Sequence, residues 1–365
     1  MNVPPTVVSQ PLEIVCQDGF TLHGHLWEPN PGTQKVEATV VVAAATGVKS
    51  AYYHRYARFL AESGLSCLTF DYRGIGDSKQ PFAVARTTRW ADWGVRDIDA
   101  ALAWVLEHRP AGRLLTAGHS FGGFGIGLAA HSTHVHRHLT VGGQHAYWRD
   151  YRPGHRTRMW WRWHVLMPAI TAVQGHFPGT RMGWLEDLPR GVALDWARGR
   201  KDFTTTARTP DQRQVMQEHL ARFDAPTLAV AGTDDPFATP AAIWRALSYS
   251  PLTRPHLWQL RPEDLDAEEI GHFGLFHDRF RTTFWPATVD WLRHGTLPPT
   301  AHLTPVRADA QDDHAPGKRS FQNAVGRCLR DDASPGVSSR MRSHGLAARA
   351  VSSRRVAPMP CDSTR

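Results

Sequence analysis

The sequence has few cysteines and no long apolar run. Its four cysteines are widely spaced and form no C-x-x-C pair: Cys16, Cys67, Cys328 and Cys361. This spacing argues against a disulfide framework and against a zinc site. No run of about 18 apolar residues is present, and the N-terminal MNVPPTVVSQ lacks the basic-then-apolar pattern of a signal peptide. We therefore expect a cytoplasmic protein with reduced thiols, no membrane insertion, and neither a metal nor another cofactor.

Positive charge is concentrated at the C-terminal end of the chain. The 365 residues include 42 Lys and Arg against 34 Asp and Glu, a formal net charge of +8. Residues 296–365 hold eleven basic and six acidic side chains, so they carry +5 and residues 1–295 carry +3. The segment 296–365 has no Trp and one other aromatic residue. We expect it to be a disordered basic tail and, because it has no clustered basic block, we expect no nucleic-acid partner.

Apolar runs and turn signals alternate along residues 12–293. The run ATVVVAAAT (38–46) is almost continuously apolar, which is typical of a strand buried on both faces. The predicted strands are 12–16, 21–27, 38–46, 65–71, 114–117, 139–144, 226–231 and 256–260. The predicted helices are 52–63, 90–108, one that opens at Gly122, 240–247 and 275–293. The alternation predicts an α/β fold with a mostly parallel sheet and helices on both faces, formed by residues 1–295.

Residues 146–224 interrupt this pattern. They contain six Trp and many Arg but no strand-like run, which indicates an insertion between two sheet strands. The tryptophans could line an apolar acyl or aryl pocket, or they could pack short helices onto the body. The arginines could indicate a negatively charged substrate group. Only five of the 42 basic side chains are Lys, so arginine is common everywhere and surface solvation is the preferred interpretation.

The strongest motif is Gly118-His119-Ser120-Phe121-Gly122, a G-x-S-x-G between the strand 114–117 and a helix. This spacing permits a tight strand-to-helix turn that raises the Ser120 hydroxyl above the sheet, where it can act as a nucleophile. The helix N-terminus then directs backbone N–H groups at a developing oxyanion. The glycines in 122–127 only loosely resemble a dinucleotide-binding loop, because their spacing is wrong and no acidic residue follows at the required distance.

A serine nucleophile needs a base, and the base needs a carboxylate that fixes its tautomer. His272 follows the last predicted strand, in the chain order Ser, acid, His. His131, His134, His136 and His138 resemble a solvated loop instead. The acid is expected after the strand 226–231, where Asp234 and Asp235 are both available. Asp235 is favoured because it lies three residues after Gly232 and precedes Pro236, and Asp234 remains the alternative.

Six segments together carry a resemblance to a known family. They are ATG (45–47), FDYRGIGDS (70–78), GHSFGG (118–123), FPGTRMGWLEDLPRGVALDWAR (177–198), GTDDPF (232–237) and GHFGLF (271–276). From about residue 12 to 295 the chain resembles the α/β-hydrolase superfamily, and within it the bacterial hydrolases of the serine-esterase and lipase-like type.

The resemblance implies specific roles for these residues. Ser120 is the expected nucleophile, Asp235 the acid and His272 the base. The backbone N–H groups of Phe121 and Val48 are the expected oxyanion donors, and residues 146–224 occupy the position of a lid. Many members have His-Gly where this chain has Thr46-Gly47, which leaves the second donor open.

These inferences predict a serine hydrolase that cleaves a carboxylic ester through an acyl-enzyme. The expected partner is therefore a small-molecule ester or acyl substrate. Two alternatives remain at this point. One is an acyltransferase that uses the same triad, and the other is a non-catalytic binding protein on a hydrolase scaffold.

Overall fold

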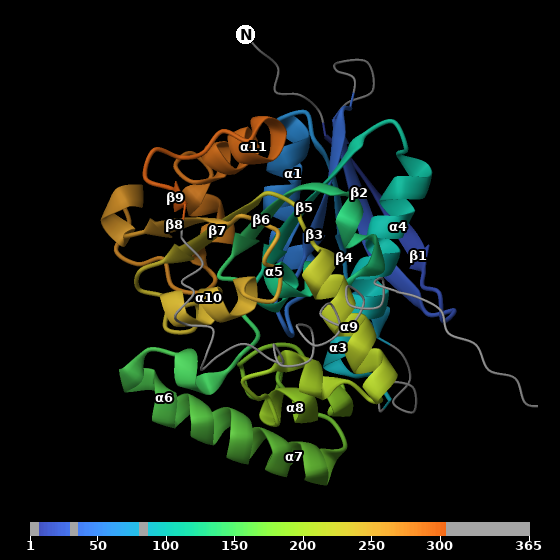
Figure 1. The fold of residues 1–365 in the computed structure, drawn as a ribbon, viewed down its shortest axis with the longest axis vertical. Coiled ribbons are helices and arrows are strands. Elements are labelled where there is room, and N and C mark those ends of the chain that lie inside the picture. Colours follow the sequence, from blue (N-terminus) through green and yellow to red (C-terminus); the bar gives the residue numbers. More distant parts are fainter. Residues whose placement is uncertain (1–6, 30–35, 80–86, 304–365) are drawn as a thin grey trace, which may run out of the picture. The chain divides into compact units, whose positions relative to one another are not determined.

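The central feature of the structure is one mixed sheet. The structure, a computed structural model, describes residues 7–29, 36–79 and 87–303, so residues 304–365 of the expected tail lie outside the described residues. Within these ranges nine strands follow the order β1-β2-β4-β3-β5-β6-β7-β8-β9 (Figure 1). Their bounds are β1 (Val7–Val15), β2 (Thr21–Pro29), β3 (Ala38–Ala43), β4 (Ser66–Phe70), β5 (Arg113–His119), β6 (Val135–Val141), β7 (Thr227–Gly232), β8 (His256–Leu260) and β9 (His302–Leu303).

The middle of the sheet is parallel and its edges are antiparallel. β4, β3, β5, β6, β7 and β8 pair in parallel, whereas β1, β2 and β9 add antiparallel strands at the two edges. Every residue of β3, β4 and β7 is buried. Strands buried on both faces are mostly apolar along their length, which explains the nearly continuous apolar runs of the sequence. The prediction of a mostly parallel sheet is therefore confirmed.

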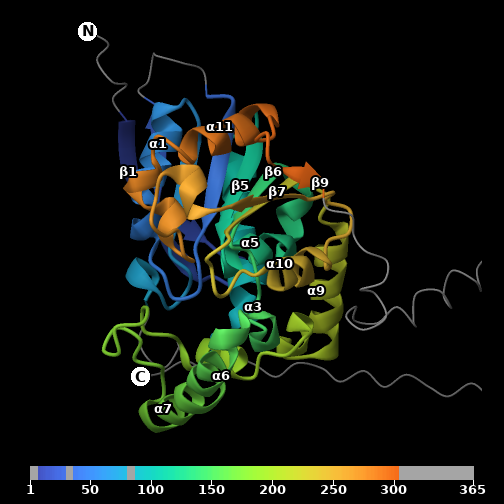
Figure 2. The same cartoon turned by 90° about the vertical axis from the view of Figure 1, so that its left-hand side faces the viewer.

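Helices cover both faces of the sheet. Their bounds are α1 (His54–Glu62), α3 (Trp90–Asp92), α4 (Asp99–His108), α5 (Phe121–Gly125), α6 (Pro153–Trp160), α7 (Met167–Gln174), α8 (Arg190–Ala197), α9 (Pro210–Arg222), α10 (Pro240–Leu247) and α11 (Trp285–His294). α1 and α11 lie side by side on one face, and α4, α5 and α10 lie on the other (Figures 1 and 2). One-turn π-helical segments, Trp93–Ile98 and Trp161–Leu166, join α3 to α4 and α6 to α7.

Several predicted elements have different bounds in the structure, among them the first strand, which begins at Val7, the last helix and β6. The last helix begins at Trp285, ten residues later than expected, because short 3₁₀ turns precede it and Pro286 occupies its first turn. β6 begins at Val135, so the segment interpreted as a solvated histidine loop is partly a strand. His138 is buried there and hydrogen-bonds Thr116 Oγ1 at 2.8 Å and the Gly123 carbonyl at 3.0 Å. Polar partners from neighbouring elements thus permit a histidine inside the sheet.

The fold continues beyond residue 295, where the tail was expected to begin. β9 pairs with β8, and Trp258 Nε1 donates a hydrogen bond to Thr300 Oγ1 at 2.9 Å. The expected boundary is therefore wrong for residues 296–303, because backbone pairing and this side-chain contact hold them against the sheet edge. None of the helices in the described ranges has the length and apolar character needed to cross a membrane.

The region 146–224 contains four of the helices. α6, α7 and α8 gather at one end of the molecule, away from the sheet (Figures 1 and 2). An isolated bridge between Phe177 and Leu188 is its one β-type pairing among the described residues. α9 packs instead against the 3₁₀ turn Ile126–Leu128 behind α5. The insertion therefore has a projecting part, formed by α6–α8, and a part that belongs to the body.

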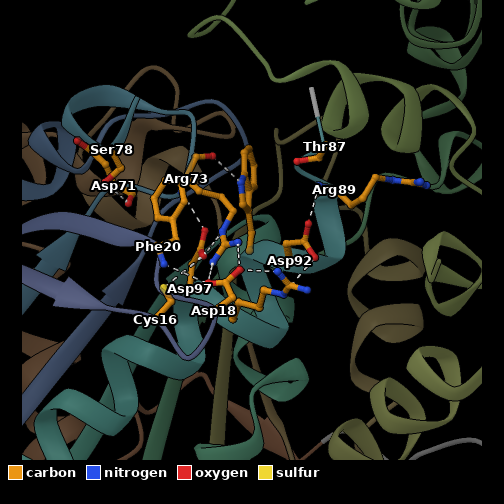
Figure 3. Close-up of polar contacts among 12 residues, drawn as sticks. Cys16, Asp18, Phe20, Asp71, Arg73, Ser78, Thr87, Arg89, Asp92 and Asp97 are labelled. Carbon is orange, nitrogen blue, oxygen red and sulfur yellow. Dashed lines mark hydrogen bonds and ion pairs between the residues drawn. The ribbon is translucent and has the colours of Figure 1, made fainter. Parts of the chain in front are cut away.

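A buried ion-pair network ties the first hairpin to the loop after β4 (Figure 3). Arg73 donates from Nε to Asp97 Oδ1 at 2.5 Å and from Nη1 to Asp18 Oδ2 at 2.7 Å. Arg73 and Asp97 are almost fully buried. Burial raises the pKa of Asp18, but hydrogen bonds and charges from Arg73 and Arg96 outweigh burial and lower it to about 2. Burial raises the pKa of Asp97 to about 6, against the opposing charge and hydrogen bonds of Arg73. Both carboxylates are therefore mostly ionised at pH 7, and the network joins three separate segments of the chain.

This network generates a stability prediction. Asp97→Asn removes one charge and leaves the buried Arg73 guanidinium paired with Asp18, which is exposed. We expect the free energy of unfolding to fall by about 3 kcal/mol, because removing the buried partner of an ion pair leaves the other buried charge incompletely compensated. Urea denaturation at pH 7 measures the change. Glu107→Gln, at an exposed carboxylate, is the control and should change it by less than about 0.5 kcal/mol. An equal effect of both variants would contradict the prediction.

Candidate active site

Ser120 lies in the turn between β5 and α5. Its backbone has φ +54° and ψ −119°, a conformation that non-glycine residues rarely adopt. The Ser120 N–H donates to the Val141 carbonyl at 2.9 Å, which anchors the turn to the end of β6. The first residues of α5 then follow at once. The strained turn raises the serine side chain out of the sheet, as the G-x-S-x-G spacing predicts.

The two glycines of the motif are required by packing. A Cβ at Gly118 would lie 2.5 Å from the Cα of Gly123, and a Cβ at Gly122 would overlap the Ala43 carbonyl oxygen. The start of α5 therefore packs directly against the backbones of β3 and β5. This close approach fixes where the Ser120 side chain and the Phe121 N–H lie.

Of the two adjacent aspartates, Asp235 is the one that contacts His272. His272 Nδ1 lies 2.7 Å from Asp235 Oδ2, and both side chains are buried. Asp235 Oδ1 also accepts hydrogen bonds from the N–H groups of Phe237 and Ala238 at 2.8 and 3.0 Å. Burial raises the pKa of Asp235, but the charge and hydrogen bond of His272, with these two N–H groups, hold it below its usual value. The carboxylate is thus ionised and oriented toward the imidazole.

Asp234 has a different role from Asp235. Its Oδ2 accepts hydrogen bonds from the backbone N–H groups of Ile270 and Gly271, at 2.8 and 3.0 Å. These residues immediately precede His272. Asp234 therefore holds the loop that carries the imidazole, whereas its neighbour contacts the imidazole itself.

Ser120 is hydrogen-bonded to a residue that the sequence did not indicate. Gln144 Nε2 donates to Ser120 Oγ at 3.3 Å, and Gln144 Oε1 accepts from the Ala146 N–H. Among the described residues, no hydrogen bond joins Ser120 to His272, although both line the same cavity. Serine–imidazole hydrogen bonds are often long without substrate. Gln144 directly follows the glycines at the end of β6, and its position is the one signal that could have identified it.

The expected second oxyanion donor, Val48, is engaged elsewhere. Its N–H donates to the Ala45 carbonyl at 3.2 Å and closes the turn in which Gly47 has φ +69°. Thr46, two residues earlier, lines the cavity with Ser120 and Phe121, whereas Val48 does not. We therefore replace Val48 by Thr46 as the candidate donor, because a turn that consumes the Val48 N–H leaves it unavailable to a ligand.

A buried hydrogen-bond chain links this turn to His272. The Ala45 N–H donates to Tyr53 Oη at 2.9 Å, Tyr53 Oη lies 2.8 Å from His119 Nδ1, and His119 Nε2 lies 2.9 Å from the His272 carbonyl. A carbonyl oxygen only accepts, so His119 carries its proton on Nε2 and accepts the Tyr53 hydroxyl proton at Nδ1. Burial, with the neighbouring His272, lowers the pKa of His119 to about 3. His119 is therefore a neutral structural link.

One cavity of about 360 Å³ contains Ser120 and His272 on its wall. Its other walls come from the turn after β3, from α3 and from the 146–224 region, and they are mostly aromatic. The aromatic lining residues are Trp90, Phe121, Tyr151, Trp163, Trp184, Trp196, Phe237 and Phe273. The described residues contain no group of three or more His, Cys, Asp or Glu side chains that could hold a metal ion. The arrangement suits a covalent attack by Ser120 on an apolar substrate.

The sheet order, the strand–turn–helix at Ser120 and the position of His272 after the last parallel strand define an α/β hydrolase. Residues 34–255, more than half of the chain, match the family described as serine aminopeptidase, S33. The chain belongs to this α/β-hydrolase family. The resemblance stated from the sequence is therefore confirmed. No curated protein matches the chain significantly.

Solved structures with the same fold are distant in sequence. A soluble variant of monoglyceride lipase from Saccharomyces cerevisiae is 16% identical, with a TM-score of 0.56, over 81% of this chain and 97% of that one. A hypothetical protein from Pseudomonas aeruginosa is 14% identical, with a TM-score of 0.53, over 80% and 95%. An esterase from Pyrococcus furiosus is 16% identical, with a TM-score of 0.50, over 79% and 91%. At such identities the likeness concerns the fold.

The packing of the turn predicts a sharp contrast between two glycines. Gly122→Ala forces a methyl group into the Ala43 carbonyl, so we expect a loss of about 3 kcal/mol or more in the free energy of unfolding. Gly154→Ala, in α6, meets no atom within 4 Å and should be neutral or stabilising by at most about 1 kcal/mol. Urea unfolding measures both variants. A Gly122→Ala protein as stable as wild type would contradict the prediction, because the turn would then be able to move and make room for the methyl group.

Proposed function

We propose that the protein is a serine hydrolase that cleaves carboxylic esters through an acyl-enzyme. The observation that carries this proposal is the buried His272–Asp235 pair, at 2.7 Å, on the wall of the same cavity as the strained Ser120 turn. A hydroxyl, an imidazole and an ionised carboxylate together supply a nucleophile, a base and the group that fixes the base. In this role Ser120 is the nucleophile, His272 the base and Asp235 the acid.

The proposed reaction has two half-reactions. His272 Nε2 takes the Ser120 proton as Oγ bonds to the ester carbonyl carbon, while the backbone N–H groups of Phe121 and Thr46 stabilise the oxyanion. The intermediate collapses, the C–O bond to the alcohol breaks, and His272 returns the proton to the leaving alkoxide. Water then attacks the acyl-enzyme with His272 as base and releases the carboxylic acid. Ser120 Oγ accepts from Gln144, so its hydroxyl proton remains available for donation to His272 in the first step.

The cavity favours esters over peptides with a free amino terminus, the substrates that the family description would suggest. A protonated α-amino group requires a carboxylate or several acceptors when it leaves water. The lining residues include no Asp or Glu, and the one formally charged side chain among them is Arg162. We further propose that the 146–224 region acts as a lid, since it contributes much of the aromatic wall.

Covalent labelling by a fluorophosphonate tests the nucleophile. Wild-type protein should be labelled at Ser120, and Ser120→Ala should lose the label completely, because the reagent forms a stable adduct only with an activated serine. Mass spectrometry of the intact protein and its peptides measures the label. Ser248→Ala, at a half-buried serine bonded to the Arg245 carbonyl, is the control and should be labelled like wild type. Label retained by a folded Ser120→Ala protein would refute the assignment.

The two adjacent aspartates should have unequal effects on turnover. Asp235→Asn removes the charge on His272 and disfavours the productive tautomer, so kcat should fall by about 10³ to 10⁴. Asp234→Asn weakens only the backbone contacts to Ile270 and Gly271, so kcat should fall by about tenfold. Ester hydrolysis at pH 8, with circular dichroism as the folding control, measures both. If Asp234→Asn were the more damaging of the two folded variants, Asp235 would not be the acid.

A further inference from the structure

Arg162 lies on the wall of the cavity without any acidic partner. It belongs to the π-helical segment between α6 and α7 and lines the same cavity as Ser120. Its guanidinium stacks 4.0 Å from the ring centroid of Trp184 and 5.8 Å from that of Trp163. Among the described residues it makes no hydrogen bond and no ion pair. All of its donors are therefore available to a ligand.

This environment differs from that of other enclosed arginines in the protein. Arg73 and Arg245 are buried, and each pairs with a buried aspartate, Asp97 and Asp150 respectively. Arg162 contacts the rings of Trp163 and Trp184, and partial burial together with Arg158 lowers its pKa. An arginine nevertheless stays protonated at neutral pH. The described residues thus place a positive charge on the wall of a largely apolar cavity and supply no counter-charge for it.

A continuous row of aromatic rings leads from the nucleophile turn to Arg162. Phe121 stacks on Trp90 at 5.2 Å between ring centroids, Trp90 on Trp196 at 5.6 Å, and Trp196 on Trp163 at 4.6 Å. Trp163 then contacts Trp184 edge to face, with 5.7 Å between the ring centroids. The Arg162 guanidinium stacks on the Trp184 ring. A flat apolar group bound beside Ser120 can therefore extend along this row to the positive charge.

The charge of Arg162 has no counterpart on the rest of the cavity wall. The lining lacks Asp and Glu, and Arg162 is its one formally charged side chain. A complementary ligand is flat and apolar, and it carries a negative charge at the end that meets Arg162.

We propose that Arg162 binds a carboxylate on an aromatic part of the ester substrate, and that the protein therefore prefers anionic aryl esters over neutral ones. This inference rests on the proposed ester hydrolysis for its substrate, but Arg162 and Ser120 are separate parts of the site. Arg162 acts here as a specificity-determining residue. It takes no part in the bond-making steps.

The test compares matched ester pairs that differ in one group. On the acyl side, 4-nitrophenyl 4-carboxybenzoate is compared with 4-nitrophenyl 4-methylbenzoate. On the alcohol side, 4-carboxyphenyl acetate is compared with 4-methylphenyl acetate. The readout is the ratio of kcat/KM for the anionic ester to that for its neutral partner, because this ratio cancels general effects of a substitution.

Wild type should favour the anionic member of at least one pair, and the arm that shows the preference identifies the side of the ester that meets Arg162. Arg162→Met should lower that ratio by about tenfold to a hundredfold, the effect expected for hydrogen bonds to a charged group. Arg158→Met is the matched control. It removes a nearby positive charge at an exposed position that does not line the cavity, and it should change the ratio by less than about threefold.

Several outcomes would overturn the inference while leaving ester hydrolysis intact. They are hydrolysis by wild type without preference in either pair, a ratio that Arg162→Met leaves unchanged, and an equal effect of Arg158→Met. If wild type hydrolyses none of the four esters, ester hydrolysis itself is in question. The role of Arg162 is then tested by binding alone, measured as quenching of tryptophan fluorescence by 4-methylbenzoate and, as the neutral control, by 4-methylbenzamide. Binding of the carboxylate that weakens at least tenfold in Arg162→Met supports the inference. Undetectable or unchanged carboxylate binding overturns it.

Discussion

The site depends on one packing constraint, the close approach of α5 to the backbones of β3 and β5. Gly118 and Gly122 allow this approach because neither position has room for a Cβ. The approach forces Ser120 into its strained conformation and fixes the first residues of α5 beside it. Strain of this kind persists only where the surrounding structure fixes it. The buried sheet therefore supplies, through packing, the rigidity that a nucleophile and an oxyanion donor require.

The other groups of the site are held in relation to that turn by buried polar contacts. His119 is next to Ser120 in the chain, and through Tyr53 and the His272 carbonyl it connects the turn after β3 to the imidazole loop. Asp234 holds the same loop from the other side. Buried hydrogen bonds of this type are costly to break, because a partner left behind cannot reach water. Three loops from distant parts of the chain thereby behave as one unit.

The sequence allowed the fold and the local part of the site to be predicted, because their signals are short in range. Apolar runs indicate buried strands, and G-x-S-x-G describes a single turn. Adjacent residues such as Asp234 and Asp235 cannot be separated by pattern alone, since a rotation of the backbone by one residue decides which of them meets His272. The engagement of the Val48 N–H could not be predicted for a similar reason, because this group closes a turn whose shape depends on tertiary packing. Gln144 belongs to no motif, and its position after the glycines that follow β6 does not by itself indicate the contact with Ser120.

Arg162 illustrates a different limit of sequence reasoning. In a chain where nearly all basic residues are arginine, composition favours surface solvation for any one of them, and the sequence gives no reason to treat position 162 differently. Its distinction is environmental, since it combines aromatic neighbours on the cavity wall with the lack of an acidic partner in the described structure. A charge that is partly desolvated without a counter-charge costs stability. A bound anionic ligand would supply the missing negative charge. Ligand binding would then offset the free-energy cost that the desolvated Arg162 imposes on the folded protein.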